Sequence, residues 1–221
     1  MLLSTAVVLV ACGNETKEQQ SISQTRQETT TMSTTIATTS TKNKEVKSGP
    51  LTEVGQYTYQ NGNGKVELIK IATPNVEKNS NNVTITIKEI KLLKTSELTN
   101  KAIDFWSQHQ VNIDDYLSNN NIYTLQVKYD VKNDNDVNIG FSQATIKSVI
   151  SSDGIEFDKV SEQLLKISPH AKKTDNASVF IIKGSSEFND ITFYTGDILR
   201  IEGSGGYHLG EGFPINVHLG E

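Results

Sequence analysis

An all-β fold, an antiparallel β-sandwich with one or two short inserted helices, is the fold class that the sequence predicts. Many short segments beyond Pro50 alternate apolar with polar residues or are rich in Val, Ile, Thr, Tyr and Phe. Turns rich in Gly, Asn and Asp separate these segments, and only two stretches show helical spacing. Numerous short strands with few helices are typical of a sandwich. We therefore place a single domain, without repeats, at residues 50–221.

The clearest strand signals lie in the middle of the chain. In one strand five apolar or aromatic residues alternate strictly with polar ones: Tyr123, Leu125, Val127, Tyr129 and Val131. This strand ends at an Asn/Asp run, residues 133–136, which is a turn by composition. An earlier strand that begins at Val83 alternates until its phase slips at Glu89, which indicates a β-bulge or a change of the buried face. Ser152-Asp153-Gly154 predicts a hairpin turn.

Shorter apolar stretches predict the remaining elements. Further strands are expected at residues 66–71, 137–141, 144–149, 155–157, 178–183, 187–194, 198–202 and 213–219. In the last of these, four apolar residues share one face: Phe213, Ile215, Val217 and Leu219. Two stretches predict helices instead, Ser96–His109 with Ser96 as its cap, and Lys159–Ile167.

Composition excludes several classes of function. A single cysteine excludes an intramolecular disulfide framework and any multi-cysteine zinc or iron–sulfur site. The formal net charge of −5 argues against nucleic acid as the main partner, because phosphate binding needs a basic face. No apolar run reaches the roughly 18–20 residues of a membrane-spanning helix. The glycine-rich runs match neither a dinucleotide fingerprint nor a nucleophile elbow, so we predict no cofactor and no catalytic residue.

A short apolar run, Leu2–Ala11, ends at Cys12 and has the length of a signal-peptide core. Its last residues, Leu9-Val10-Ala11-Cys12, resemble the lipobox of bacterial lipoproteins. The resemblance implies that residues 1–11 are a signal peptide and that Cys12, diacylated through its sulfur, becomes the new N-terminal residue. Two acyl chains at one residue supply the stable anchor that a single chain does not. We expect a protein anchored by lipid in the cell membrane and facing the extracellular side.

Two features around this segment qualify the prediction. Residues 1–11 contain no Lys or Arg, although a signal peptide begins with a positively charged region, so either the true start lies upstream or the recorded start is misplaced. In the alternative interpretation, Leu2–Ala11 is an ordinary buried segment and Cys12 a core cysteine. The Thr-, Ser- and Gln-rich residues that follow cannot build the rest of such a core. We therefore interpret residues 12–49 as the acylated cysteine and a disordered tether with a root-mean-square span of roughly 30 Å.

Several of the strand and turn signals form a recognisable pattern. The strand at residues 122–133 with its Asn-rich turn, Phe141, and the hairpin before Phe157 resemble the telokin-like, immunoglobulin-like (Ig-like) domain of unknown function that is common on Gram-positive lipoproteins and related to the immunoprotective extracellular protein fold. That family also has a late strand with an aromatic residue, here Ile191-Thr192-Phe193. The resemblance covers about residues 80–200 and implies an Ig-like sandwich without an assigned activity. Residues 97–121 look like an insertion into it.

The insertion contains the candidate binding residues. Phe105, Trp106 and Tyr116, if exposed, would form a binding patch, since Trp and Tyr anchor interfaces. In the alternative, Trp106 covers the end of the sandwich core. No metal site is predicted, because the four histidines lie far apart in the sequence and because the run from Asp134 to Asn138 lacks the glycine and glutamate of an EF-hand loop.

These observations lead to one preferred function and two alternatives. We expect the Ig-like domain to be a non-enzymatic binding module for a surface protein or a cell-wall partner. The first alternative is a cell-wall hydrolase with paired carboxylates, such as Asp153 with Glu156 or Asp104 with Asp114. The second is a ligand-sensing or transport-associated subunit. A pocket lined by two carboxylates would favour the enzyme, and an aromatic patch on the insertion would favour the binding module.

Overall fold

The computed structural model describes residues 44–60, 62, 64–108, 112–162, 165–183 and 188–220. The predicted signal peptide, Cys12 and most of the predicted tether lie outside these residues. Within the described part of the chain, no helix is both long and apolar enough to cross a membrane.

One large sheet and one small sheet make up the domain. The large sheet has the strand order β1 (Lys44–Glu45), β2 (Gln56–Gln60), β3 (Gly64–Ala72), β5 (Val83–Ser96), β6 (Ile122–Asn133), β10 (Lys172–Ile182), β9 (Glu156–Glu162), β8 (Ile146–Ser151), β11 (Asp190–Thr195) and β14 (Pro214–His218), with β4 (Val76–Ser80) paired to β5. The small sheet has the order β13 (Gly205–Gly210), β12 (Ile198–Glu202) and β7 (Ile139–Phe141). Only the short β1–β2 pair is parallel among these described pairings.

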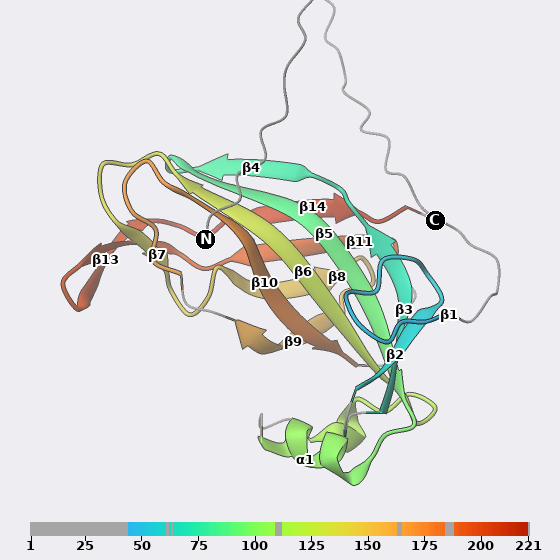
Figure 1. Ribbon diagram of the computed structural model, residues 1–221. Coiled ribbons are helices and arrows are strands. Elements are labelled where there is room, and N and C mark those ends of the chain that lie inside the picture. Colours follow the sequence, from blue (N-terminus) through green and yellow to red (C-terminus); the bar gives the residue numbers. More distant parts are fainter. Residues whose placement is uncertain are drawn as a thin grey trace, which may run out of the picture. The chain divides into compact units, whose positions relative to one another are not determined.

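The large sheet folds back on itself to form the predicted sandwich. In Figure 1, β5, β6 and β10 pass in front of β8, β11 and β14, and β9 joins the two layers because it pairs with both β10 and β8. The main core lies between the layers and contains side chains from both, each at most 1% exposed: Ile85, Leu125, Phe180, Phe193 and Ile215. The all-β sandwich predicted from the sequence is confirmed.

Several local predictions are also confirmed. β6 contains the alternating residues, and they share one face: Leu125, Val127, Tyr129 and Val131 belong to the main core, and Tyr123 packs against it. The register between β5 and β6 shifts between Ile87 and Glu89, where the phase slip predicted a bulge. Gly154 has a φ of 83° in the turn that joins β8 to β9, a conformation that glycine adopts without strain. The four apolar residues of the last predicted strand are all buried.

Both helix predictions require correction. Lys159–Ile167 is not a helix: its first residues belong to β9, which pairs on both sides, and Ile167 makes a β-bridge with Ile139. Two flanking strands satisfy the backbone groups here, and this pairing outweighs the helical spacing of a few apolar residues. The other helix, α1 (Asn100–Gln108), begins after Thr99, whose Oγ1 accepts a hydrogen bond from the Ala102 N–H at 3.3 Å. Ser96, the expected cap, remains in β5.

The insertion between β5 and β6 forms α1 and a short 3₁₀ turn, η1 (Ile113–Asp115). These elements lie at one end of the sandwich (Figure 1). A second core, separate from the main one, forms where the insertion packs on the sheet, and it consists of Trp106, Ile113, Tyr116, Ile122 and Ile181. The insertion is therefore packed onto the sheet by its own apolar side chains.

Candidate functional site

Two of the three residues of the predicted binding patch are buried. Trp106 and Tyr116 are only 8% and 7% exposed and pack against Ile122 and Ile181 of the sheet. The side chain of Phe105 lies outside the described residues. Packing these two rings against Ile122 and Ile181 removes their apolar surface from water. The condition of the binding patch, exposure, is therefore not met by Trp106 and Tyr116, and the burial of Trp106 agrees with the interpretation that it covers the end of a core.

Tyr116 fastens the insertion to the sheet through a polar contact. Its hydroxyl donates to Asp158 Oδ2 at 2.6 Å, and Lys183 Nζ lies 3.3 Å from the same oxygen. The Lys183 ammonium also lies 4.9 Å from the centre of the Tyr116 ring, within cation–π range. Burial raises the pKa of Tyr116, and the Asp158 carboxylate raises it further. Tyr116 is thus a structural residue that joins η1 to β9 and β10.

Trp106 nevertheless lines a pocket on the face of the sheet that points away from the main core. This Trp106 pocket has a volume of about 170 Å³ and is lined by Gln60, Val66, Leu93, Thr95, Trp106, Thr124, Gln126 and Val179. Three cross-strand pairs supply six of these residues: Val66 with Thr95, Leu93 with Thr124, and Gln126 with Val179. The pocket therefore combines residues from β2, β3, β5, β6, β10 and α1, which lie far apart in the sequence.

The lining of the Trp106 pocket is uncharged. Two amides and two hydroxyls provide hydrogen-bond donors and acceptors, while Trp106 and the aliphatic residues provide apolar surface. Ligand pockets commonly have this character, an apolar wall with a few placed polar groups. A volume of about 170 Å³ suits one small uncharged unit, or the end of a larger molecule, better than a whole drug-sized ligand.

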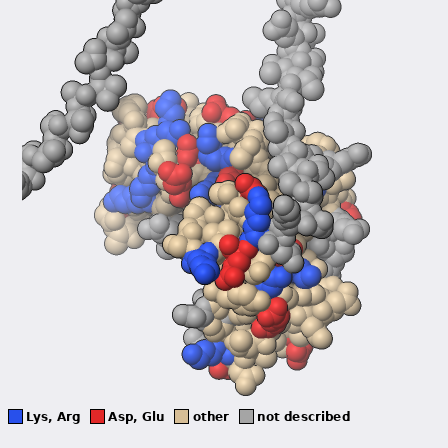
Figure 2. All heavy atoms as spheres, turned by 45° about the vertical axis from the view of Figure 1, so that its right-hand side comes forward, with Lys and Arg blue, Asp and Glu red and all other residues tan. Residues whose placement is uncertain are grey.

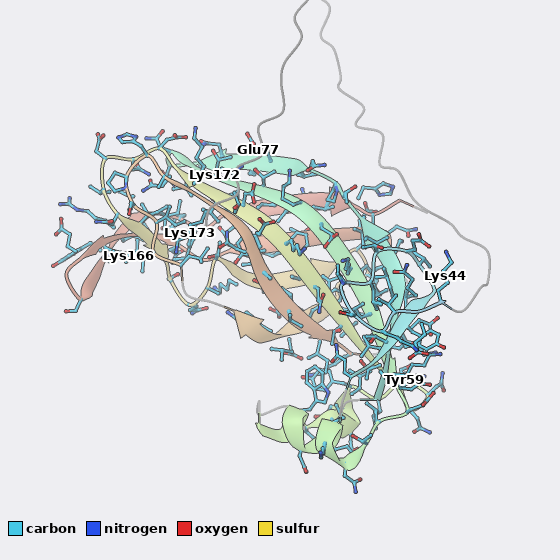
Figure 3. The ribbon with its side chains drawn as sticks, viewed as in Figure 1. Lys44, Tyr59, Glu77, Lys166, Lys172 and Lys173 are labelled. Atoms are coloured by element: carbon cyan, nitrogen blue, oxygen red, sulfur yellow. The ribbon has the colours of Figure 1, made fainter. Side chains whose placement is uncertain are left out.

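An exposed aromatic residue lies on the hairpin that contributes Gln60 and Val66 to this pocket; Tyr59 pairs with Lys65 and therefore faces away from Val66. Tyr59 is 54% exposed and packs edge-on against Tyr57, with ring centres 5.9 Å apart. Figure 3 shows Tyr59 at the α1 end of the domain, and Lys172 and Lys173 towards the opposite end of the sheet. The nearby Glu97 carboxylate raises the pKa of Tyr59. Sequence analysis did not select Tyr59, since an isolated Tyr in a short strand carries no distinctive signal.

The paired carboxylates of the hydrolase alternative line neither of the two pockets described, the Trp106 pocket and a second one beside β11 and β12. Asp153 and Glu156 are exposed near the β8–β9 turn, where Asp153 accepts a hydrogen bond from Ser151. Asp104 and Asp114 are exposed on the insertion. These carboxylates therefore do not form the lining of a described cavity.

The acidic run after β6 makes separate polar contacts. Asp134 pairs with Lys132 at 2.9 Å, and Asp136 lies 2.9 Å from His170. The Asn135 amide donates to the carbonyl of Asn81 at 3.0 Å. These contacts hold the turn after β6 against neighbouring segments, and a turn at these residues is what the sequence predicted.

Surface charges are mixed on the outward face of β5 and β6. Glu89 lies 3.2 Å from Lys91 and 3.5 Å from Lys128, and Asp130 lies 2.8 Å from Lys172. Figure 2 likewise shows basic and acidic side chains interspersed on the face that it presents. Much of the lysine charge on this part of the sheet is therefore compensated locally.

Comparisons with known proteins identify no family. No family model matches the chain, and no curated protein matches it. A functionally unknown protein from Listeria monocytogenes EGD-e has a similar structure, with a TM-score of 0.47 and 13% identity over 71% of this chain and 89% of that one. A candidate lipoprotein, YcdA, from Bacillus subtilis subsp. subtilis str. 168 has a TM-score of 0.42 and 12% identity, over 66% of this chain and 39% of that one. The chain thus matches well under half of the Bacillus protein. The telokin-like assignment stays a prediction, while the β-sandwich itself is observed.

Proposed function

We propose that this protein is a lipid-anchored, extracellular binding module without enzymatic activity, and that its sandwich holds an uncharged sugar unit of a cell-wall glycan in the Trp106 pocket. The observation that carries the proposal is the lining of that pocket. A sugar ring presents hydroxyl groups at its edge and C–H groups on its faces. The amides and hydroxyls of the pocket match the former, and Trp106 with the aliphatic residues matches the latter.

The same lining favours binding over hydrolysis. Glycoside hydrolysis commonly needs two carboxyl groups on either side of the bond that breaks. The residues that line the Trp106 pocket include no Asp, Glu or His. A bound sugar would therefore meet hydrogen-bonding groups with no acid or base among them.

The proposed location, on the outer side of the cell membrane, fits a cell-wall glycan as the partner. Cys12, diacylated, would anchor the chain in the membrane, and the predicted tether of about 35 residues spans roughly 30 Å on average. A domain held at that distance from the membrane could meet glycan strands of the wall. A surface protein remains the second candidate partner, since the exposed Tyr59 on the β2–β3 hairpin is a residue type that is frequent in protein interfaces.

The fluorescence of Trp106 reports directly on the pocket, because Trp106 is the single tryptophan of the chain. We expect its fluorescence emission to change in a saturable manner when soluble, uncharged cell-wall glycan fragments are titrated into the full-length protein. A bound glycan that covers the edge of the Trp106 ring changes the environment of the indole, and the emission depends on that environment. Calorimetry of the same titration gives the affinity without relying on the fluorophore.

Two matched variants separate the pocket from the rest of the sheet. Thr124→Val removes a hydroxyl inside the Trp106 pocket and should weaken binding about 5- to 10-fold, as expected for the loss of one hydrogen bond. Thr86→Val makes the same change on β5 outside the pocket, where Thr86 contacts Glu77, and should bind normally. The proposal fails if emission and heat show no saturable binding, or if both variants bind as tightly as the native chain.

A further inference from the structure

Three side chains with metal-binding atoms converge at the end of the domain that carries β13, away from α1 (Figure 1). They are Asp197, His208 and Glu211, and one donor atom of each lies within 4.8 Å of the others. His208 Nε2 is 3.3 Å from Glu211 Oε1. We propose that these residues form a binding site for a divalent transition-metal ion, with Zn²⁺ as the best match.

The strand pairing explains why the three residues meet. Asp197 immediately precedes β12, His208 lies on β13, and Glu211 follows the end of β13. The two strands are antiparallel neighbours, and their register shifts between Ile198 and Leu199, opposite Gly210 and His208. The hairpin therefore returns His208 and Glu211 to the start of β12, where Asp197 lies.

Asp197 is held in place before any ion binds. Its N–H donates to Ser142 Oγ at 2.9 Å, and its carbonyl accepts from the Ser142 N–H, also at 2.9 Å. Its Oδ1 accepts from the Gly212 N–H at 3.1 Å. Ser142 thus fixes the backbone of Asp197, and the Gly212 N–H orients its carboxylate, as outer partners orient metal ligands.

Two glycines make this corner tightly packed. A Cβ on Gly196 would lie 2.1 Å from the Ser142 carbonyl oxygen, and one on Gly212 would lie 2.3 Å from the Thr195 carbonyl oxygen. Side chains are excluded at both positions, so the backbone segments around Asp197 approach closely. Rigid backbone beneath one ligand reduces the conformational entropy that an ion has to overcome on binding.

The donor set suits a borderline ion rather than Ca²⁺ or Mg²⁺. Zn²⁺ takes imidazole nitrogen and carboxylate oxygen at about 2.0–2.2 Å, whereas Ca²⁺ and Mg²⁺ prefer oxygen alone. Three protein ligands leave a position for water or for another molecule. Asp197 and Gly212 also line an open pocket of about 290 Å³ together with Lys147 and Tyr194, so there is room beside the ion.

The test is a titration of the full chain with ZnCl₂, followed by calorimetry. We expect one ion to bind per chain at about pH 7.5. Glu211→Gln and His208→Ala should each raise the Kd at least about 10-fold, since each removes a direct ligand. Glu211 is 83% exposed, so its substitution leaves the fold intact.

His218 supplies the matched control. It also pairs with a carboxylate, Asp190, at 2.7 Å, but is not part of the three-residue group. His218→Ala should bind zinc as the native chain does. The proposal is overturned if no binding is detected at millimolar zinc, if His208→Ala and Glu211→Gln leave the Kd unchanged, or if the loss occurs with His218→Ala instead. In those cases, His208 and Glu211 form only a surface ion pair.

Discussion

Asp130 illustrates how a single side chain is stabilised on the outward face of the sheet. It lies on β6, its carboxylate is largely buried, and it contacts Lys172 Nζ at 2.8 Å and the Asp175 N–H at 3.2 Å. Burial by itself raises the pKa of Asp130. The hydrogen bonds from Lys172 and Asp175 and the charges of Lys172 and Lys88 outweigh it, so the pKa is lowered overall.

This lowered pKa predicts a loss of stability in acid. The stabilising contribution of Asp130 is present above the ordinary pKa of Asp and is lost as the pH falls through the lower pKa of the folded state, below about pH 4. Asp130→Asn should therefore lower the free energy of unfolding at pH 7 by about 1–3 kcal/mol and flatten its decrease in acid. Urea unfolding between about pH 7 and pH 2 measures both effects. Asp104→Asn, an exposed residue on α1, should leave the pH profile unchanged; an equal change in both variants would contradict the assignment.

Asn133 shows what residue type alone does not reveal. The sequence predicts a turn residue, yet Asn133 is fully buried and its amide donates to the carbonyls of Val137 at 2.8 Å and Ser168 at 2.9 Å. Its Oδ1 accepts from the Asn135 N–H at 3.0 Å. The side chain ties the loop after β6 to a segment more than 30 residues away. This contact is determined by the tertiary structure, because nothing within the turn indicates its distant partner.

At the scale of elements, the insertion is attached to the sheet by a small core and one polar contact. Trp106 of α1, Ile113 of η1 and Tyr116, which follows η1, belong to this core. The Tyr116 hydroxyl donates to Asp158 of β9, and Asp158 also pairs with Lys183. Because Trp106 also lines the proposed glycan pocket, we expect the position of the insertion to affect binding as well as stability.

Tyr116→Phe tests this coupling. The variant keeps the ring but loses the hydrogen bond to Asp158, which is half exposed and still pairs with Lys183, so stability should fall by only about 1 kcal/mol. Trp106 emission should shift if the insertion loosens, and thermal unfolding should show a lower Tm. Tyr207→Phe, a change at an exposed tyrosine, serves as the control. Unchanged stability in Tyr116→Phe would show that the apolar contacts alone hold the insertion.

At the scale of the whole molecule, the folded-back large sheet and the small sheet place two distinct features at different ends of the domain. The Trp106 pocket lies at the α1 end, and the Asp197–His208–Glu211 group lies at the end with β13 (Figure 1).

Lys70 links β3 to two later parts of the chain. It donates to Asn189 Oδ1, just before β11, at 3.2 Å and to the carbonyl of Gly220, after β14, at 3.0 Å. Partial burial lowers the pKa of Lys70.

The predicted lipid anchor is tested on the intact protein in bacterial cells. Cells grown with a clickable fatty acid should label the native chain in the membrane fraction. Cys12→Ala should abolish the label and release the protein from the membrane, since the predicted acylation site is the sulfur of this single cysteine. Val8→Ala, before the lipobox, is the control and should remain labelled. Equal labelling of native and Cys12→Ala chains, or no labelling of either, would contradict the lipoprotein prediction.

The sequence by itself determined the fold class, most of the strands and the bulge near Glu89, because a period of two residues and turn composition are local properties. Only the tertiary structure decided that Lys159–Ile167 begins as a strand, since its partners β8 and β10 lie elsewhere in the chain. It also decided that Trp106 and Tyr116 are buried, and it gathered the Trp106 pocket from cross-strand neighbours. Burial and convergence depend on which segments meet, which the spacing of residues along one segment does not record.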